Sequence, residues 1–509
     1  MSGISRRITL NVIANYLGQG WSAFMAVAFL PVYISAFGFE SYGLIGFFTV
    51  LQSTLLIFDV GVTATLTREA ANQSSGLRTK QSLRNLVRSC EYIGGLLNTL
   101  IALLVWGLAD RLAGEWINSN LLPAETVVLS IALMGIVIAI RLQEGIYRGV
   151  LLGLGSQVIL NVASALLATA RYGGSAVVVY YGFQNIIAFF IWQVFVSLIS
   201  LVVFAVLAYR RLPVTHQPQR FSLESLVSIW RFSAGMAVVA GLSILMANLD
   251  KLIFSGIFQL DEFGRYVLAA TVASTLYLFV VPITQGFYPY MVDAYSRGDR
   301  RLLILLHHTS SQAVTVVAGS MAILLILFSW PVLFVWSGND SVAREISPIL
   351  SVLATAALAN SLGHVGHNLQ IVTGATRSLL VTSSGTLLLA LFVLPVVAIN
   401  HGLAEAAQVW LGIAILQASI VLYLPHRSCV RGEGFQWLFR DVIPPLAGAL
   451  STVWLLSCFI PEPEMGRLLL SGYIVVTVCA SFGVAVWLAP NLRDRLKATL
   501  SATRQQYFG

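Results

Sequence analysis

Three charged side chains lie at the spacing of one helical face inside an otherwise apolar stretch of the sequence. Arg141, Glu144 and Arg148 stand at i, i+3 and i+7, so a helix would carry them along one side. A guanidinium group binds phosphate oxygens through two parallel hydrogen bonds, and this face could therefore receive a pyrophosphate group. The alternative is an ion-paired stripe that only ends the helix near an interface. We assign Arg141 to anion binding, Glu144 to ion coupling or gating, and Arg148 to the ion-paired alternative.

Asp59, Asp250 and Lys251 are further ionisable groups within apolar stretches. Such groups cost several kcal/mol inside a bilayer unless they are paired or face water, so each is a functional candidate. Asp59 is either a cavity carboxylate for ion coupling or gating, or a structural partner of Arg68 or of a backbone group. Asp250 is a second candidate for ion coupling or gating. Lys251 is its helix neighbour, pointing about 100° away, and either binds pyrophosphate or an acidic sugar, or extends toward the membrane surface. We expect only one of this pair to face a cavity.

Two stripes of amide and imidazole side chains recur at the spacing of one helical face. They are Asn11, Asn15 and Gln19 in the first stripe, and Asn360, His364, His367 and Asn368 in the second. Amides and imidazoles both donate and accept hydrogen bonds, as sugar hydroxyls require, so we assign both stripes to substrate binding. The alternative is hydrogen bonding between helices in the core of a bundle. His364 and His367 form a His-x-x-His pair without a nearby carboxylate, and we predict no metal site.

These side chains must be positioned by membrane-spanning helices, because apolar stretches long enough to cross a bilayer recur about fourteen times. Of the 509 residues, 57% are hydrophobic and only 10% are charged, which is too little charge to cover a soluble protein of this size. The sequence therefore predicts an all-α integral membrane protein. The predicted spans are residues 10–37, 42–67, 87–109, 123–148, 154–170, 176–209, 232–258, 263–292, 303–336, 346–372, 379–399, 403–424, 442–460 and 468–488.

Basic residues fall mainly in every second gap between these spans, and Lys and Arg are held on the cytoplasmic side during insertion. The gaps that we assign to that side contain Arg78, Lys80, Arg84 and Arg88; Arg210, Arg211 and Arg220; Arg297, Arg300 and Arg301; and Arg427 and Arg431. We therefore expect both termini to be cytoplasmic, with the first apolar stretch retained as a helix. The net charge of +8 fits topology and anionic lipid headgroups, so we expect membrane lipids and no nucleic acid as partners. We interpret His307 and His308 as interfacial residues.

An internal repeat predicts two lobes. Residues 37–43 align with residues 258–264 at a constant offset of 221, and each copy has a Phe, an acidic residue and an aromatic-Gly pair in the same order. The copies are six spans apart, which predicts two parallel six-helix lobes that can give alternating access. Chance similarity between two apolar hairpins is the alternative. The predicted domains are the lobes 1–213 and 214–430, an appended helix pair 431–490, and a basic cytoplasmic tail 491–509.

Short motifs at the openings of the two lobes together resemble a known family. They are Asn15-Tyr-Leu-Gly18, Pro31-Val-Tyr33, Tyr42-Gly43, Phe58-Asp-Val-Gly61 and Thr67-Arg-Glu69 in the first lobe, and Asp250-Lys251, Gly264-Arg-Tyr266 and Pro289 in the second. Through them the chain resembles the polysaccharide-export branch of the multidrug/oligosaccharidyl-lipid/polysaccharide (MOP) exporter superfamily, which contains the O-antigen and exopolysaccharide flippases.

This resemblance implies a transporter and not an enzyme. The implied activity is movement of a polyprenyl-pyrophosphate-linked oligosaccharide from the inner to the outer leaflet of the bacterial cytoplasmic membrane, for surface polysaccharide biosynthesis. The implied substrate is an undecaprenyl-pyrophosphate-linked glycan, and the implied protein partners are a polysaccharide polymerase and co-polymerase. We expect a monomer without a cofactor.

Missing motifs restrict the alternatives. The sequence contains no Gly-x-x-x-x-Gly-Lys-Ser/Thr phosphate loop, no Gly-x-Ser-x-Gly and no His-Glu-x-x-His motif. A membrane polysaccharide polymerase or ligase is one alternative, but the short outer gaps leave no domain for its active site. A multidrug or cation exporter of the same superfamily is the other, but Arg141 and Lys251 make the candidate site more basic than a cation would favour. A lipid II flippase is disfavoured because the first span has no arginine after Arg7.

Overall fold

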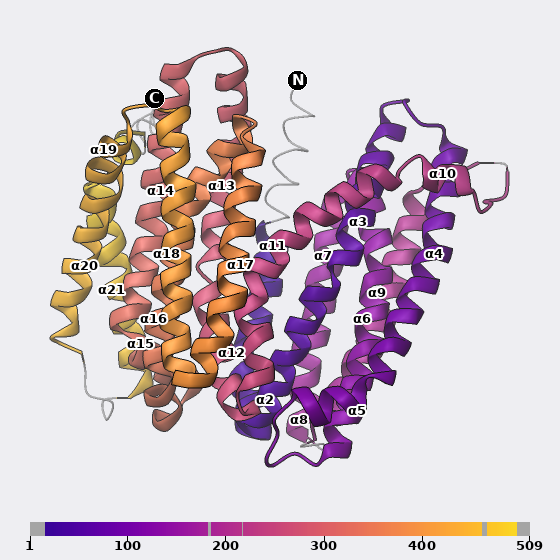
Figure 1. Ribbon diagram of the computed structural model, residues 1–509, viewed down its shortest axis with the longest axis horizontal. Helices are drawn as coiled ribbons and strands as arrows, with labels where there is room; N and C mark the ends of the chain where they lie inside the picture. Colours follow the sequence, from indigo (N-terminus) through magenta and orange to yellow (C-terminus); the bar gives the residue numbers. More distant parts are fainter. Residues whose placement is uncertain (1–15, 182–184, 216, 461–465, 496–509) are drawn as a thin grey trace, which may run out of the picture. The chain divides into compact units, whose positions relative to one another are not determined.

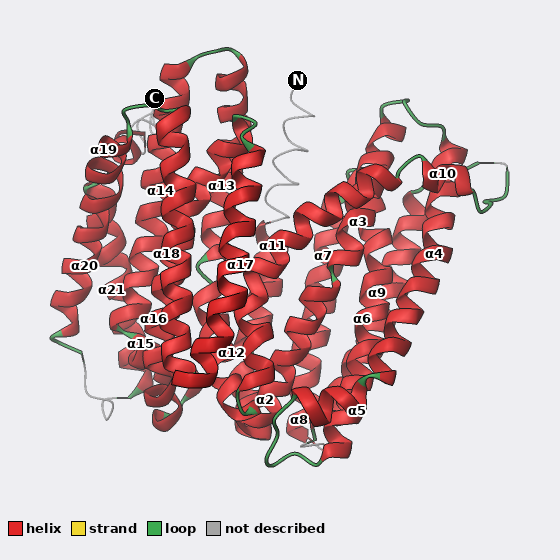
Figure 2. Ribbon diagram, viewed as in Figure 1, coloured by secondary structure: helices red, strands yellow, loops and turns green. Residues whose placement is uncertain are grey.

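The computed structural model describes residues 16–181, 185–215, 217–460 and 466–495. Nearly all of these residues are helical, and short loops join the helices (Figure 2). The described ranges contain one isolated β-bridge, between Asn118 and Gln259, and no longer strand. Twelve of the described helices are long and apolar enough to cross a membrane. The prediction of an all-α membrane protein is therefore confirmed.

The chain divides into two compact units, Met1–Arg265 and Tyr266–Gly509 (Figure 1). Helical residues 16–28 open the described part of the first unit. They are followed there by α2 Leu30–Leu55, α3 Ile57–Ser74, α4 Lys80–Gly107, α5 Ala109–Arg111, η1 Leu112–Trp116, α6 Ala124–Gly153, α7 Gln157–Ala168, η2 Thr169–Gly173, α8 Gly174–Tyr181, α9 Ile186–Arg211, α10 Leu223–Val227 and α11 Trp230–Ile257. Helix α12, Leu260–Ser274, contains the boundary. The lobe limits predicted from the repeat, 1–213 and 214–430, stay a prediction.

The second unit continues with a further set of helices. They are α13 Tyr277–Ser296, α14 Arg300–Leu327, α15 Ser329–Ser337, α16 Asp340–Val372, α17 Thr376–His401, α18 Leu403–Ser428, α19 Gly434–Gln436, η3 Trp437–Val442, α20 Ile443–Ser457 and α21 Arg467–Trp487. Within this unit α14 packs against α13, α16, α20 and α21. Apolar side chains of α14, α20 and α21 form one continuous buried cluster, so the two helices of the predicted appended pair share the core of the unit.

The break predicted between the first two spans is a kink and not a loop. Helix α2 runs through it, and only Gly38, with φ 77° and ψ 175°, leaves the helical conformation. Glycine reaches this left-handed region without the steric penalty that a Cβ atom would bring. The chain instead separates α2 from α3 at Leu56, inside the second predicted span. The start of the first predicted span lies outside the described residues.

Two other predicted boundaries are wrong for a common reason, which is the presence of π-helical turns. Helical structure after Gln157 continues through the π-helical residues 169–173 to Tyr181, whereas the prediction ended the span at residue 170. Near the end of the chain, π-helical residues 437–442 precede α20 and leave it only 15 residues long. This short α20 is one reason why twelve and not fourteen helices have the length of a span.

A ridge of glycines on α6 brings α3 unusually close in the first unit. Gly145, Gly149 and Gly153 are four residues apart and lie on the face of α6 that contacts α3. A Cβ atom at Gly149 would lie 2.8 Å from the carbonyl oxygen of Thr63, and one at Gly153 only 2.3 Å from that of Thr67. Small residues at this spacing allow main chains to approach in membranes, where helix packing replaces the hydrophobic effect. The ridge therefore fixes α3 against α6.

Helix α6 is the centre of the first unit, because it packs against α3, α4 and α9 (Figure 1). It begins directly after Pro123, and Glu125 in its first turn places negative charge at the positive end of the helix dipole. Buried Leu, Val and Phe side chains of α3, α4, α6 and α9 form the core cluster around it. Helix α6 thus holds its polar residues inside the unit.

Candidate functional site

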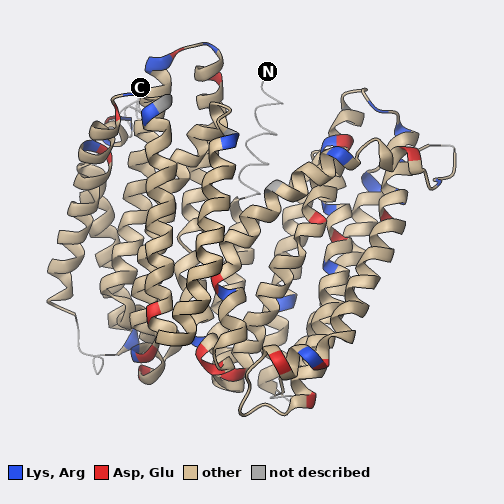
Figure 3. Ribbon diagram, viewed as in Figure 1, with Lys and Arg blue, Asp and Glu red and all other residues tan. Residues whose placement is uncertain are grey.

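Charged residues gather near the ends of the helices, and few lie along their middle parts (Figure 3). Arg141 is one of these few, near the middle of α6. Its Nη2 donates to Oε1 of Gln193 over 2.9 Å, its Nε lies 3.4 Å from Oγ of Ser197, and its Nη1 donates to the side-chain oxygen of Gln52. Its guanidinium carbon is 5.3 Å from the ring centre of Phe48. All four partners are neutral, and α2 and α9 supply them.

Glu144 and Arg148 form the ion-paired part of the predicted charged face. Nη1 of Arg148 is 3.0 Å from Oε1 of Glu144, and the hydroxyl of Ser200 donates to Oε2 of Glu144 over 2.6 Å. Arg148 also stacks over the ring of Phe204, with 5.1 Å from its guanidinium carbon to the ring centre. Arg148 therefore compensates Glu144, as the ion-paired alternative proposed, while the hydrogen bonds of Arg141 all go to neutral groups.

Asp59 lies on α3 against the glycine ridge. A Cβ atom on Gly145 would come within 2.1 Å of Oδ1 of Asp59, so the carboxylate occupies space that only glycine leaves open. The hydroxyl of Thr63 donates to the same oxygen over 2.9 Å. The alternative pairing of Asp59 with Arg68 is wrong, because Arg68 contacts Glu69 at 2.7 Å and covers a phenylalanine ring. Asp59 is thus next to Glu144 in space, on the neighbouring helix.

The motif Thr67-Arg-Glu69 fastens the end of α3 to the start of α4. Oε2 of Glu69 is 2.5 Å from Nη1 of Arg78, and its other oxygen pairs with Arg68. Burial alone would raise the pKa of Glu69, but the hydrogen bonds and charges of the two arginines outweigh burial and hold this pKa below its ordinary value. The motif therefore closes the loop between two helices and does not contribute to the polar interior.

Asp250 and Lys251 pair with each other on α11. Nζ of Lys251 is 3.4 Å from Oδ1 of Asp250 and 3.2 Å from the carbonyl oxygen of Ala247. The Asp250 side chain is 2% exposed and that of Lys251 is 21% exposed, so the two neighbours differ in accessibility as their helical angle predicts. Both residues stay candidates. Of the two, Lys251 is the one whose side chain is accessible at the surface of its unit.

The second polar stripe lies on α16, and part of it contacts α13. Its members are Asn360, His364, His367 and Asn368, all of them half-buried. The side chain of Asn368 donates to the carbonyl oxygen of Thr284 over 3.0 Å, and the ring of His364 packs edge-on against Tyr277 with 5.8 Å between centres. Asn368 thus makes the contact between helices that was the alternative to sugar binding. Of the first stripe, Asn11 and Asn15 lie outside the described residues, and Gln19 is exposed.

The second unit also contains a buried ionisable cluster that the sequence analysis missed. His308 places Nδ1 on a carboxylate oxygen of Asp441 and Nε2 3.3 Å from Glu433, so each ring nitrogen faces a carboxylate. Gln312 donates to the other oxygen of Asp441 over 2.7 Å. His307 lies 3.3 Å from a ring nitrogen of His426. Both histidines are buried within the unit, and their interpretation as interfacial residues stays a prediction.

This histidine cluster joins α14 to the helices that follow α18. Asp441 lies in η3, and the indole of Trp437 in the same turn donates to Ser311 of α14 over 3.0 Å. The partners are 119 to 133 residues apart in the sequence. The one pattern that could have indicated a shared site is the spacing of His308 and Gln312, which are four residues apart on one helix face. Among the described residues, no three His, Cys, Asp or Glu side chains converge as metal ligands.

Long apolar helices around charged and amide groups define a multi-pass membrane protein, and its fold is that of MOP superfamily transporters. The fold is similar to that of an inward-facing multidrug resistance MATE family transporter of this superfamily, with a TM-score of 0.64, 14% identity, and coverage of 80% of this chain and 94% of that one. It is also similar to the lipid II flippase MurJ in an inward closed conformation, with a TM-score of 0.68, 11% identity, and coverage of 94% and 99%.

The sequence places the chain more narrowly. The profile of the family described as "Polysaccharide biosynthesis protein" matches residues 8–295, more than half of the chain, and the chain belongs to this family. A protein of Shigella flexneri named "Putative O-antigen transporter" is 21% identical over 427 residues, which cover 83% of this chain and 98% of that protein. The resemblance inferred from the short motifs is confirmed.

Proposed function

We propose that the protein is a flippase that moves a polyprenyl-pyrophosphate-linked oligosaccharide from the inner to the outer leaflet of the bacterial cytoplasmic membrane. Membership of the polysaccharide biosynthesis family and similarity to an O-antigen transporter support the role in surface polysaccharide export. The fold shared with MOP superfamily transporters supports alternating access as the mechanism. Both termini lie on the cytoplasmic side in this proposal, as the distribution of basic residues predicts.

Arg141 is the observation that carries the proposal. Three neutral side chains hold its guanidinium, and within the described residues it has no carboxylate partner. A guanidinium has five N–H donors, so about two stay available for a ligand after these three bonds. A buried charge is costly unless a counter-charge or hydrogen bonds satisfy it, and a pyrophosphate supplies both. The neighbouring Glu144 is already compensated by Arg148 and does not compete for Arg141.

In this proposal the remaining candidate residues either contact the sugar or headgroup of the substrate or take part in ion coupling or gating. The candidates for sugar or headgroup contacts are Asn11, Asn15, Gln19, Lys251, Asn360, His364, His367 and Asn368. Asp59, Glu144 and Asp250 are the candidates for ion coupling or gating. The proposal includes a monomer, with polysaccharide polymerase and co-polymerase proteins as downstream partners.

Deletion of the gene tests the function. We expect the complete lipid-linked repeat unit to accumulate in the cytoplasmic leaflet, inaccessible to a lectin added outside spheroplasts, while synthesis of the unit continues. Re-expression of the wild-type chain restores lectin access. Accumulation of flipped but unpolymerised units outside would instead identify a polymerase or ligase. Unchanged glycan together with accumulation of cationic dyes would identify a multidrug exporter.

A further inference from the structure

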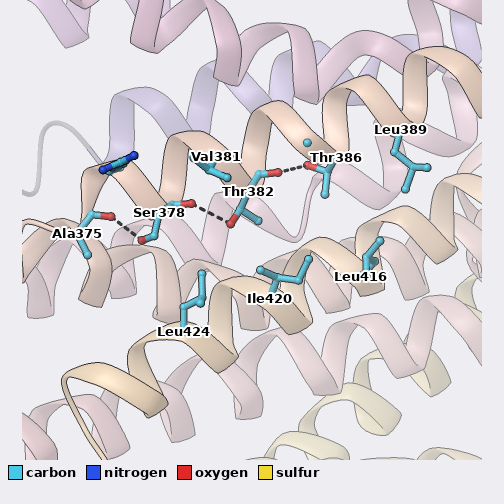
Figure 4. Close-up of a pocket in the computed structure, with 11 residues that line it drawn as sticks. Ala375, Ser378, Val381, Thr382, Thr386, Leu389, Leu416, Ile420 and Leu424 are labelled. Atoms are coloured by element: carbon cyan, nitrogen blue, oxygen red, sulfur yellow. Dashed lines mark hydrogen bonds between the residues drawn. The ribbon is translucent and has the colours of Figure 1, made fainter.

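A groove of about 750 Å³ runs between α17 and α18 in the second unit. Ser378, Thr382 and Thr386 lie along its α17 wall, and Ile420 and Leu424 lie along the facing α18 wall (Figure 4). These positions are four residues apart on each helix, so the groove follows the axes of two adjacent antiparallel helices. It is separate from the polar groups described above.

The hydroxyl groups in this groove do not make it polar. Ser378 donates to the carbonyl oxygen of Ala375 over 2.7 Å, Thr382 to Ser378 over 2.9 Å, and Thr386 to Thr382 over 2.9 Å. Each hydroxyl hydrogen is thus used within α17 itself, and the methyl groups of the threonines and the leucine and isoleucine side chains remain as lining (Figure 4). A sugar would find few donors here, whereas a hydrocarbon chain would lose no hydrogen bonds on entering.

One cation stands at the end of the groove. Arg377 lines it beside Ala375, at the start of α17, and its side chain is exposed. Within the described residues Arg377 makes no hydrogen bond, ion pair or ring contact, unlike Arg297, which pairs with an aspartate one turn away at 2.9 Å. The distribution of basic residues assigns this end to the cytoplasmic side. An unpaired guanidinium at the membrane surface matches a phosphate headgroup.

The length of the groove suits a long hydrocarbon chain. From Ala375 to Leu389 its α17 wall covers fourteen residue steps, or about 21 Å at the rise of an α-helix. One leaflet contributes about 15 Å of the hydrocarbon core. From Arg377 to Leu389 the wall covers twelve residue steps, or about 18 Å, so a chain that fills the groove reaches about the middle of the bilayer. A polyprenyl chain is long enough to do so.

We propose that this groove binds the polyprenyl chain of a polyprenyl diphosphate lipid, with the diphosphate on Arg377. The inference rests on the proposed function and deepens it, because it places the lipid part of the substrate on an exposed face of the second unit. The glycan can then reach the polar groups of the protein while its hydrophobic anchor never leaves hydrocarbon. Transfer between leaflets would follow α17 and α18.

Gly385 offers a way to fill the groove without disturbing the fold. It lines the groove, and a Cβ atom built on it meets nothing within 4 Å. Gly472, on α21 of the same unit, also has open space around it but does not line the groove, so Gly472→Phe is the matched control. The test uses the full chain in nanodiscs and a polyprenyl diphosphate with a photoreactive diazirine on its tail. Crosslinked peptides are mapped by mass spectrometry.

We expect the wild-type chain to be labelled on α17 and α18. Gly385→Phe is expected to lower labelling about tenfold, and Arg377→Gln to weaken binding about tenfold because one charged phosphate contact is lost, with Arg377→Lys retaining part of it. Unlabelled polyprenyl diphosphate should compete, and phosphatidylglycerol should not. Equal competition by phosphatidylglycerol, labelling only elsewhere, or unchanged labelling of Gly385→Phe would each overturn the proposal.

A flipping assay in proteoliposomes separates this proposal from the function itself. Wild-type chain that moves the lipid-linked oligosaccharide, with Gly385→Phe slowed and Gly472→Phe unchanged, supports the groove. Wild-type and Gly385→Phe chains that flip equally fast overturn the groove and leave the flippase function intact. Wild-type chain that binds the lipid probe but moves no oligosaccharide contradicts the flippase function.

Discussion

The two units bury charge in opposite ways. In the first unit, Arg141 lies among two glutamine side chains, a serine and a phenylalanine ring, none of which carries charge. In the second unit, His308 lies between Asp441 and Glu433, with one carboxylate at each ring nitrogen. The histidine cluster thus brings acidic and basic side chains into direct contact, whereas the hydrogen-bond partners of Arg141 are all neutral.

This difference indicates which group acts on a ligand and which supports the fold. A compensated buried network holds its parts together, and removal of one partner strands the other charge in the low-dielectric interior. A buried charge with only neutral partners contributes less to the free energy of unfolding. Its desolvation costs free energy, and no opposite charge offsets that cost. Such an arrangement is favourable only when a ligand of opposite charge arrives. The comparison therefore supports the proposal that Arg141 binds the substrate, and the histidine cluster lies at the joint between α14 and η3.

The largest effect on stability is expected from Asp441→Asn. The change keeps the size of the side chain but removes the charge opposite His308, and breaking a buried pair costs about 3–5 kcal/mol. Thermal unfolding of the full chain in detergent measures it. Asp494→Asn is the control, because that carboxylate is 70% exposed in its pair with Arg493, and exposed pairs contribute less than about 1 kcal/mol. Equal midpoints for the two variants would contradict the comparison.

Arg141→Met tests the other side of the comparison. Methionine keeps much of the length and apolar volume of arginine but offers no donor to a phosphate. We expect export to fall about a hundredfold, equivalent to about 2.7 kcal/mol, with an unchanged or higher unfolding midpoint. Arg148→Met makes the contrast, since it leaves Glu144 buried without its cation and should lower the midpoint. A large loss of stability in Arg141→Met would show that this arginine is structural.

A smaller effect is expected from Ser200→Ala, which removes the hydroxyl that donates to Oε2 of Glu144 at 2.6 Å. The loss of one hydrogen bond to a charged group lowers the free energy of unfolding by about 1.5–3 kcal/mol. We expect a value near the lower end of this range, because Arg148 still pairs with Glu144. Ser419→Ala is the control, because its hydroxyl donates only to a carbonyl oxygen of its own helix, at 2.7 Å from Ile415. Equal stability losses would mean that Glu144 does not depend on Ser200.

Helical spacing predicted which polar side chains share a helix face, but it could not predict what they would contact. The sequence analysis separated Arg141 from Arg148, and their partners differ: Arg141 contacts neutral side chains and Arg148 pairs with Glu144. The role of Arg141 in anion binding stays a prediction. The partners Gln52 and Gln193 stand 89 and 52 residues from Arg141, on helices whose packing no local pattern specifies. For the same reason the repeat and the charge pattern gave no sign that η3 returns to α14.

Local competition explains the wrong predictions. Arg68 was considered as a partner for Asp59, but it pairs with its sequence neighbour Glu69 at 2.7 Å. Gly38 was read as part of a loop, although a single left-handed residue was enough to redirect the chain. Spans were also cut at residues where the hydrogen bonding changed from α to π without ending the helix. For the helices, the pattern of apolar residues predicted where a helix lies, but it did not predict the residue at which the helix ends.

Every glycine codon becomes an alanine codon through a change in its second base alone. At Gly153 that substitution would place a methyl carbon 2.3 Å from a main-chain oxygen of α3, and at Gly145 it would place one 2.1 Å from the carboxylate of Asp59. Either helix α3 moves away or the carboxylate leaves its place beside Glu144. By contrast, Gly95 and Gly107 on α4 have open space around them and can accept the same substitution. The same single-base change is therefore harmful at Gly145 and Gly153, where another helix fills the space, and tolerated at Gly95 and Gly107, where the space is open.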